Sequence, residues 1–320
     1  MAAAAFDRLV ELLQGDDVMT GATQGAVIVI SSHVVRGTVG NRAAVFALET
    51  LGFPVWAMPT VTLPWHPGHG PASRIIADDA EFAALLADLA KHPKLGEVAG
   101  IVTGYFGSAG QVAAVAELVD AVKAANPQAI YLCDPVMGDV VDGEGRLYVP
   151  QAQADAIVRD LLPRADWVTP NPFELSILSG DEIATAPETI AVSAKKLARD
   201  TVVVTSVPAL RRGHIGNLLL RDGQSTVVEH RAVETHGRPL NGLGDLASAL
   251  LLGRSLSGVD AKQALGLTCA SLHEVMAISA QAGSDELLLE SAAQSLLRPR
   301  SPVETRSLSV VRKAPKRKPA

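Results

Sequence analysis

The sequence predicts an α/β protein built on a doubly wound, mostly parallel sheet. Short β-branched runs alternate with helical patterns along most of the chain. Hydrophobic residues make up 48% of the 320 residues but aromatic residues only 4%, so the core must consist of Ala, Val, Leu and Ile. Aliphatic strands of this kind suit a parallel sheet that helices bury on both faces, and repeated strand–helix–strand order implies right-handed crossovers.

The expected strands are short apolar runs, most of which lead into a polar or glycine-containing loop. The last two flank Asp222-Gly223, a dipeptide typical of a tight hairpin turn. In chain order, strands are expected at 26–31, 55–61, 97–105, 129–136, 166–171, 201–207, 217–222 and 225–233.

The expected helices lie between these strands and carry apolar residues at three- and four-residue spacing. In one of them Val112, Val115 and Val119 fall on one face, and the Asn126-Pro127 pair ends the helix. Helices are expected at 41–52, 79–91, 110–127, 151–162, 188–199, 244–256 and 260–281, with a short one starting at Pro172.

Charge and composition set the ends of the chain apart. From Arg298 onward there are eight Lys/Arg and one acidic residue, a net charge of +7, so the rest of the chain carries −13 of the total of −6. The segment contains proline and lacks periodicity, so we expect 298–320 to be a basic disordered tail. A weak contact of this tail with nucleic acid or an acidic partner is the alternative to a solvated tail.

The same composition argues against several protein classes. No uninterrupted apolar run reaches about 18 residues, and the N-terminus lacks a secretory apolar segment, so we expect no membrane span. Cys133 and Cys269 both lie in apolar stretches without a zinc-ligand pattern. We therefore expect two buried, reduced thiols and a cytoplasmic protein.

Ligands in open α/β sheets bind beyond the carboxyl ends of the strands. One loop expected there is Gly242-Leu243-Gly244-Asp245, which leads directly into a helix. Glycines let backbone amides approach a ligand, and the helix N-terminus attracts anions. Asp245 has two explanations: it favours the helix dipole, or it acts as a general base beside bound phosphoryl oxygens.

Two further loops carry carboxylates. Asp134 follows a buried strand and precedes Pro135, and Asp139 lies five residues on; such acids suit a hydrated magnesium ion or, alternatively, a solvated turn. Glu174 matches Asn171 in a capping box, with Pro172 in the first helical turn, and could equally hold water on a magnesium ion.

A fourth loop, Ser31-Ser32-His33, could orient a polar ligand or be purely structural. No nucleophile elbow surrounds Ser32, no Walker A sequence is present, and no GxGxxG follows the first strand. The sequence therefore gives no support for a Ser hydrolase, a P-loop nucleotide site or a dinucleotide-binding fold.

Six stretches in this order resemble the ribokinase-like superfamily and, within it, the pyridoxal kinases. The resemblance runs from about Val27 to about Leu297 and implies a three-layer αβα sandwich, preceded by a partly disordered extension over 1–24, a domain over 25–297 and the tail at 298–320. The stretches are Ser32–Gly37 with Gly40–Arg42, Thr103–Ser108, Cys133–Asp139, Asp142–Pro150, Thr169–Glu174 and Gly242–Asp245.

The resemblance implies transfer of the γ-phosphate of ATP to the 5′-hydroxymethyl group of pyridoxal, and of pyridoxine and pyridoxamine, in vitamin B6 salvage. It also implies a homodimer and a requirement for Mg²⁺, and it leaves open a requirement for a monovalent cation such as K⁺. It assigns Asp245 as the base, with the backbone of Gly242, Leu243 and Gly244 as an anion hole. Substrate would be bound by Ser32, Pro67, Gly68, Tyr105 and Asp245; the nucleotide and metal by Asp134, Asp139, Tyr148, Thr169, Glu174 and Thr205, with Asp134 and Glu174 nearest the metal.

Two departures from the family pattern leave alternatives open. Leu243 stands where the family often has Thr, and Pro67 replaces a residue whose hydroxyl would touch the substrate. One alternative is a hydroxymethylpyrimidine kinase of the same superfamily, against which the stretch Ser32–Gly37 argues. The other is a non-catalytic B6-binding protein, which these two departures motivate.

Overall fold

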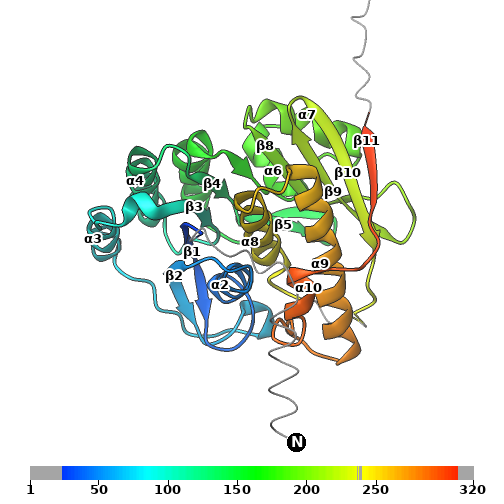
Figure 1. The fold of residues 1–320 in the computed structure, drawn as a ribbon, viewed down its shortest axis with the longest axis horizontal. Coiled ribbons are helices and arrows are strands. Elements are labelled where there is room, and N and C mark those ends of the chain that lie inside the picture. Colours follow the sequence, from blue (N-terminus) through cyan, green and yellow to red (C-terminus); the bar gives the residue numbers. More distant parts are fainter. Residues whose placement is uncertain (1–23, 236, 238–239, 309–320) are drawn as a thin grey trace, which may run out of the picture.

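A nine-stranded sheet forms the centre of the computed structural model, which describes residues 24–235, 237 and 240–308 (Figure 1). The strand order is β11-β10-β9-β8-β7-β4-β3-β1-β2. The six strands from β8 to β2 in this order run parallel, and β9, β10 and β11 are antiparallel additions. The sheet strands are β1 (Ala26–Val34), β2 (Val55–Leu63), β3 (Val98–Thr103), β4 (Ile130–Cys133), β7 (Trp167–Val168), β8 (Thr201–Pro208), β9 (His214–Arg221), β10 (Gln224–Arg231) and β11 (Glu304–Leu308).

Helices cover both faces of this sheet, which confirms the expected three layers. The α-helices are α2 (Asn41–Thr50), α3 (Asp79–Leu89), α4 (Ala109–Ala125), α5 (Gln151–Ala156), α6 (Pro172–Ser179), α7 (Pro187–Lys196), α8 (Leu243–Leu256), α9 (Ala261–Gln281) and α10 (Ala293–Leu297). A π turn over Ile157–Leu161 continues α5, so a single helical segment spans most of the expected 151–162.

Two apolar cores follow from the alternation of side chains along the strands. Ile28 and Ile30 of β1 pack on the core shared with α3, α4, α5, α6 and α7. Val27 and Val29 point to the opposite face, where α2, α8, α9 and α10 form the second core. Figure 1 shows α2, α8 and α9 grouped on that second side. Burial of both faces explains why the parallel strands are almost continuously aliphatic.

Two hairpins close with left-handed turn residues. Asp222 and Gly223 have φ of 51° and 73° between β9 and β10, which confirms the turn expected there. A second hairpin, β5 (Gly138–Val141) with β6 (Glu144–Leu147), turns at Asp142-Gly143 and was not expected as strands. Its residues 139–146 are exposed, so no alternating apolar pattern marks them as strands.

The expected disordered tail from Arg298 onward is wrong up to Leu308. The strand β11 pairs antiparallel with β10 from Glu304 to Leu308 and so covers what would otherwise be an exposed sheet edge. Glu304 forms ion pairs with Arg211 and with Arg306. The charge and proline content of this segment predicted disorder, but five of its residues form a short polar strand at the sheet edge. The rest of the proposed tail, and residues 1–23 of the proposed N-terminal extension, lie outside the described residues.

The expectation of two buried cysteines agrees with the structure. Cys133 and Cys269 are both buried, and burial raises the pKa of each thiol to about 12, so neither is a reactive thiolate. Within 24–235, 237 and 240–308, none of the helices combines the length and the apolar character needed to cross a membrane.

Candidate active site

Five strand ends meet at one edge of the sheet, where the predicted loops lie side by side. Backbone hydrogen bonds link them in sequence: the Asp134 amide donates to Thr103, the Thr169 amide to Cys133, and the Thr205 amide to Pro170. β1 lies between β2 and β3 in the sheet, so the chain reverses its winding direction beside it. This is the crevice at which open α/β sheets bind ligands.

Asp245 lies in the first turn of α8 and reaches the end of β1. The Ser31 hydroxyl donates to its Oδ1 atom at 3.5 Å and in turn accepts the Tyr105 amide at 3.2 Å. Burial raises the pKa of Asp245, and hydrogen bonds from the Gly40 amide and Ser31 partly offset this rise. A carboxylate with a raised pKa is a stronger proton acceptor than an exposed one.

Gly242 explains why glycine stands at the mouth of α8. Its φ is +91°, and a Cβ atom at this position would lie 2.2 Å from the Thr38 carbonyl oxygen. It is the N-cap of α8, and no side chain caps the helix there. The first backbone N–H groups of this 14-residue helix therefore have no N-cap side chain to accept their hydrogen bonds, although the Asp245 amide donates to its own carboxylate. The expected anion hole is consistent with this geometry.

Asp134 belongs to a buried chain of hydroxyl groups that ties three elements together. The Ser248 hydroxyl donates to its Oδ2 atom at 2.9 Å, and the Thr169 hydroxyl lies 2.9 Å from Ser248. Burial, and then the charges of Glu174 and Asp245, raise the pKa of Asp134. Asp134 and Asp245 therefore lie close together, although 111 positions separate them in the chain.

The loop after Asp134 is strained. Val136 has φ of 40°, a left-handed conformation that is costly for a β-branched residue. Its backbone amide donates to Asp134. Strain of this kind persists where surrounding contacts impose it, and it is common at ligand sites.

Glu174 fixes this strained loop against α6. The expected capping box with Asn171 is present, and the Asn171 amide donates to Glu174 Oε2 at 3.0 Å. The Met137 amide donates to Oε1 at 2.8 Å, which joins the loop to the helix. Burial raises the pKa of Glu174 to about 7 despite these hydrogen bonds. The local explanation is thus complete, and any metal role of Glu174 would act through water.

The donors here are carboxylate oxygens, as Mg²⁺ prefers. In the part of the chain that the structure describes, no three His, Cys, Asp or Glu side chains are arranged to hold a metal by themselves. Magnesium commonly keeps several waters and binds through one or two carboxylates plus substrate phosphates. Asp134, with water-mediated help from Glu174, fits that mode and would benefit from a cation that offsets the mutual repulsion of the carboxylates.

The remaining expected residues surround this centre. Asp139 and Tyr148 lie together on the β5–β6 hairpin segment, where burial and then the Asp139 carboxylate raise the pKa of Tyr148. Thr205 follows Val204 at a bulge of β8, beside Pro170. Pro67 and Gly68 form a tight turn after β2, and the nearest atom of Asn241 is 3.4 Å from where a Gly68 Cβ would be.

Ser31 and Gly40 contact Asp245 and were not predicted to do so. Ser32, which was predicted to bind substrate, is buried with its hydroxyl against Gly40, where a Cβ atom would lie 2.4 Å from it. Side chains alternate along β1, so Ser31 lies on the same face as Val27 and Val29, which is the face that α8 covers. Ser248 was also missed, although its spacing of three residues from Asp245 places both on one helix face.

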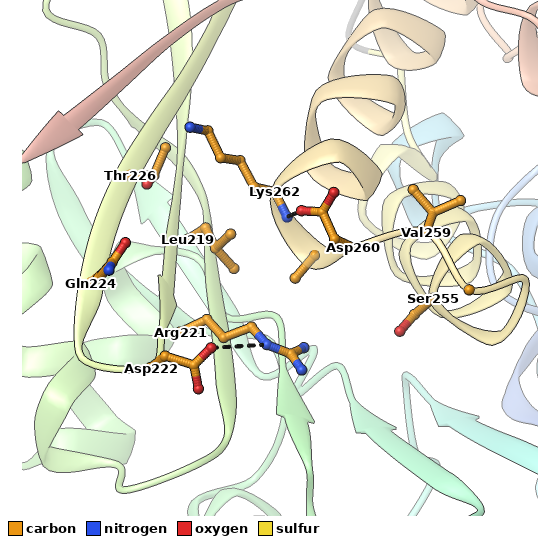
Figure 2. Close-up of a pocket in the computed structure, with 11 residues that line it drawn as sticks. Leu219, Arg221, Asp222, Gln224, Thr226, Ser255, Val259, Asp260 and Lys262 are labelled. Carbon is orange, nitrogen blue, oxygen red and sulfur yellow. Dashed lines mark hydrogen bonds and ion pairs between the residues drawn. The ribbon is translucent and has the colours of Figure 1, made fainter.

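A cavity of about 420 Å³ at the other end of α8 does not belong to this site (Figure 2). Three of its charged side chains already have partners within the fold: Arg221 pairs with Asp222, and Asp260 accepts the Lys262 amide as the N-cap of α9. Its lining includes Ser255 and Gly258, whereas Asp245 lies in the first turn of the same helix.

The raised pKa of Glu174 predicts a measurable pH dependence of stability. Its folded-state pKa of about 7 exceeds the ordinary value of 4.5, so the folded state holds a proton that the unfolded state releases between these pH values. The stability contributed by this group is present below pH 4.5 and is lost as the pH rises through 7. We expect the unfolding free energy of the wild type, minus that of Glu174→Gln, to fall by about 2 kcal/mol from pH 5 to pH 8.

Denaturant titration without divalent cations measures this difference. Glu174→Gln keeps an oxygen that can accept the Met137 amide but cannot titrate, so the contributions of groups that do not interact with Glu174 cancel. A difference that stays constant or grows with pH would show that Glu174 is ionised in the folded protein throughout this range.

Comparison with known proteins places the chain among small-molecule kinases. A model of the phosphomethylpyrimidine kinase family matches residues 83–288. A pyridoxal kinase of Deinococcus radiodurans is 34% identical over 296 residues, which are 89% of this chain and 97% of that protein. A pyridoxal kinase of Rubrobacter xylanophilus is 35% identical over 285 residues, covering 85% and 94%.

Solved structures agree with these relatives. Pyridoxal kinase from Leishmania donovani in complex with ADP and pyridoxamine has a TM-score of 0.81 and 30% identity, and the match covers 89% of this chain and all of that chain. The same enzyme in complex with ADP and pyridoxine has a TM-score of 0.80. The expected ribokinase-like fold is thereby confirmed.

Proposed function

The chain belongs to the pyridoxal kinase family, and we propose on that basis that it phosphorylates the 5′-hydroxymethyl group of pyridoxal with ATP. The product is pyridoxal 5′-phosphate, and the reaction serves vitamin B6 salvage. Pyridoxine and pyridoxamine are expected as further substrates, since a relative binds both beside ADP. The observation that carries the proposal is the position of Asp245 at the start of α8, next to Gly242 and Gly244 and close enough to Asp134 for its charge to raise the Asp134 pKa.

Phosphoryl transfer requires one base and groups that hold the phosphoryl oxygens. Asp245 accepts the proton of the 5′-hydroxyl while that oxygen forms a bond to the γ-phosphorus of ATP. The bond from the γ-phosphorus to the bridging oxygen breaks, and ADP leaves with the electron pair. The amides from Gly242 to Asp245 hold the transferring oxygens, which helix α8 favours through its positive end.

The nucleotide would lie across the loops that follow β4, β7 and β8. We assign Thr169 and Thr205 to contacts with ATP, and Asp139 and Tyr148 of the β5–β6 hairpin to a flap over it. Asp134 and, through water, Glu174 would hold Mg²⁺, which supplies charge neutralisation on the phosphates when bound. Support comes from their common location at the carboxyl edge of the sheet.

The vitamin would lie between β1, β3 and the segment Trp65–Gly70, which we call the substrate lid. We assign Ser32, Pro67, Gly68 and Tyr105 to this region, together with Ser31 on the basis of its contact with Asp245. Pro67 offers no side-chain hydroxyl, so substrate contacts of the lid would rest on backbone groups and neighbouring residues. Leu243 keeps its backbone amide and packs its side chain partly against the second core.

A competition between substrates tests this function. We expect turnover of pyridoxal with Mg-ATP to exceed turnover of hydroxymethylpyrimidine by at least about tenfold, since the buried polar groups of a matched site reject a poorly paired analogue. The absorbance of the phosphorylated product measures the turnover of pyridoxal. The family model named for phosphomethylpyrimidine kinase makes that second substrate the necessary comparison. Preferred turnover of the pyrimidine would overturn the assignment, and ligand binding without phosphate transfer would favour a non-catalytic protein.

We also propose that the enzyme is a cytoplasmic homodimer. Two buried free cysteines support a reducing compartment, and membership of the family supports the dimer. Light scattering of the purified protein at micromolar concentration tests the assembly, and a mass of one chain would contradict it.

A further inference from the structure

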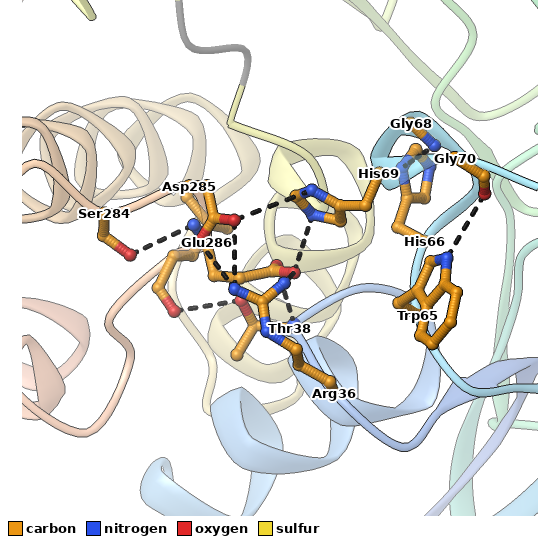
Figure 3. A network of polar contacts seen from close by, with 11 residues as sticks. Arg36, Thr38, Trp65, His66, Gly68, His69, Gly70, Ser284, Asp285 and Glu286 are labelled. Atoms are coloured by element: carbon orange, nitrogen blue, oxygen red, sulfur yellow. Dashed lines mark hydrogen bonds and ion pairs between the residues drawn. The ribbon is translucent and has the colours of Figure 1, made fainter.

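A buried carboxylate outside the reacting centre joins two loops at its rim. Glu286 follows α9, and its residue is only 7% exposed. The Thr38 amide donates to its Oε2 atom at 3.3 Å, and Nε2 of His69 lies 2.9 Å from its Oε1 atom. Arg36 Nη1 approaches the same oxygen at 3.4 Å (Figure 3). A residue from the C-terminal part of the chain thus binds the loop after β1 and the substrate lid after β2 at once.

Both of these loops touch the segment that carries the anion hole. The Thr38 carbonyl lies so close to Gly242 that a Cβ atom there would be 2.2 Å from it. Gly68 of the lid faces the side chain of Asn241. A shift of either loop would therefore be transmitted to the entrance of α8 or would open the side of the vitamin pocket.

The contacts inside this group are unequal. Arg36 forms a two-pronged pair with Asp285 at 2.8 and 3.0 Å, but both side chains are about half exposed, and such pairs contribute little. Glu286 is shielded, and its backbone neighbours are close: a Cβ atom at Gly37 would lie 2.6 Å from Oε1. Loss of a shielded acceptor leaves the Thr38 amide without its partner, which is the more costly change.

Two hydrogen bonds within the lid hold its residues together. The Gly68 amide donates to His66 Nδ1 at 3.1 Å, and the Trp65 indole donates to the Gly70 carbonyl at 3.2 Å (Figure 3). Burial, and then the neighbouring His69, lower the pKa of His66, in keeping with an Nδ1 atom that accepts a hydrogen bond. His69 connects this lid to the segment after α9, with Nε2 2.9 Å from Glu286 Oε1 and Nδ1 at the longer distance of 3.7 Å from Asp285 Oδ2.

We propose that Glu286 is a positioning residue for the vitamin substrate, an inference that rests on the proposed function. Through the Thr38 amide and His69 it holds the loop after β1 and the substrate lid in the arrangement that binds pyridoxal. It touches neither the nucleotide loops nor the Asp134 chain, so its effect falls on the vitamin and not on ATP.

Steady-state kinetics of Glu286→Ala test this role. We expect KM for pyridoxal to rise roughly tenfold, as befits loss of a shielded hydrogen-bond acceptor, while KM for ATP changes less than about threefold. A smaller fall in kcat should accompany this rise, because the Thr38 loop also contacts Gly242 at the entrance of α8. Glu286→Gln should recover most of the loss, because its amide oxygen can accept the Thr38 amide and its NH₂ group can donate to His69. His69→Ala should raise KM less, and its effect should largely disappear in the Glu286→Ala background.

Glu290→Ala is the matched control, since Glu290 is an exposed acid on the same segment and should leave every parameter unchanged. If the wild type does not phosphorylate pyridoxal, the proposed function itself fails. If it does, and KM for pyridoxal is the same in Glu286→Ala, the positioning role is wrong. If Glu286→Ala instead impairs KM for ATP, kcat and thermal stability as strongly as KM for pyridoxal, and Glu286→Gln restores none of them, Glu286 has a general structural role. That result would overturn the proposal.

Discussion

Asp245→Asn should lower kcat for pyridoxal phosphorylation by about 10³-fold, because it removes the only group we assign to accept the proton of the attacking hydroxyl. The substitution is nearly isosteric, and the Asn oxygen can still accept the Gly40 amide that now holds the carboxylate. ATP binding should persist, since the residues assigned to the nucleotide follow other strands. Single-turnover phosphate transfer, together with nucleotide binding by calorimetry, measures the two effects separately.

Asp260→Asn provides the matched control. It makes the same change of charge at the start of α9, where Asp260 is the N-cap and Asn caps equally well. If Asp245 served only to complement the dipole of α8, the two variants would behave alike and lose at most about 1 kcal/mol of stability. Turnover of Asp245→Asn near the wild-type rate would therefore contradict its role as the base.

The sheet could be predicted because burial on both faces leaves a strong signal. Val27 to Ile30 are all apolar since alternate side chains enter two different cores, and this pattern survives without knowledge of the partners. The strand β11 escaped because its residues are mostly polar and exposed, and only the neighbouring edge of β10 makes Glu304–Leu308 a strand. The strand conformation of this segment therefore depends on tertiary contacts, which the local sequence does not reveal.

The candidate site was predictable in its loops but not in its contacts. Glycine at position 242 could be recognised as a requirement for close backbone approach, and the approach proves to be that of Thr38. Ser31 and Ser32 are adjacent and chemically identical, and alternation along β1 puts Ser31 on the face of Val27 and Val29; only the packing of α8 on that face shows that Ser31 is the one that meets Asp245. Glu286 lies 41 positions after Asp245 in a segment with no motif, and its role follows only from which loops it touches.

Gly242→Ala should have the second large effect. The left-handed φ of +91° costs an Ala residue about 1 kcal/mol, and its Cβ atom would meet the Thr38 carbonyl oxygen at 2.2 Å. The collision is between the backbone-attached Cβ atom of residue 242 and the backbone oxygen of Thr38, so no side-chain rotation relieves it. The loop before α8 must therefore move, and its amides move away from the transferring phosphoryl group. Loss of one such donor lowers kcat by about 10²- to 10³-fold, and we expect a fall of that size with ATP binding largely retained.

Gly258→Ala, at the opposite end of the same helix, separates the effect of backbone strain from the effect of the collision with Thr38. Gly258 has a similar φ of +82°, but no atom lies within 4 Å of its Cβ position. It should therefore show the backbone cost of about 1 kcal/mol in thermal unfolding while leaving kcat unchanged. If Gly242→Ala behaved in the same way, losing stability but keeping its turnover, the amides at the mouth of α8 would not be the groups that hold the phosphate. A loss of turnover confined to Gly242→Ala would instead tie catalysis to the position of that backbone, because conformational strain is common to both variants and the collision with Thr38 is not.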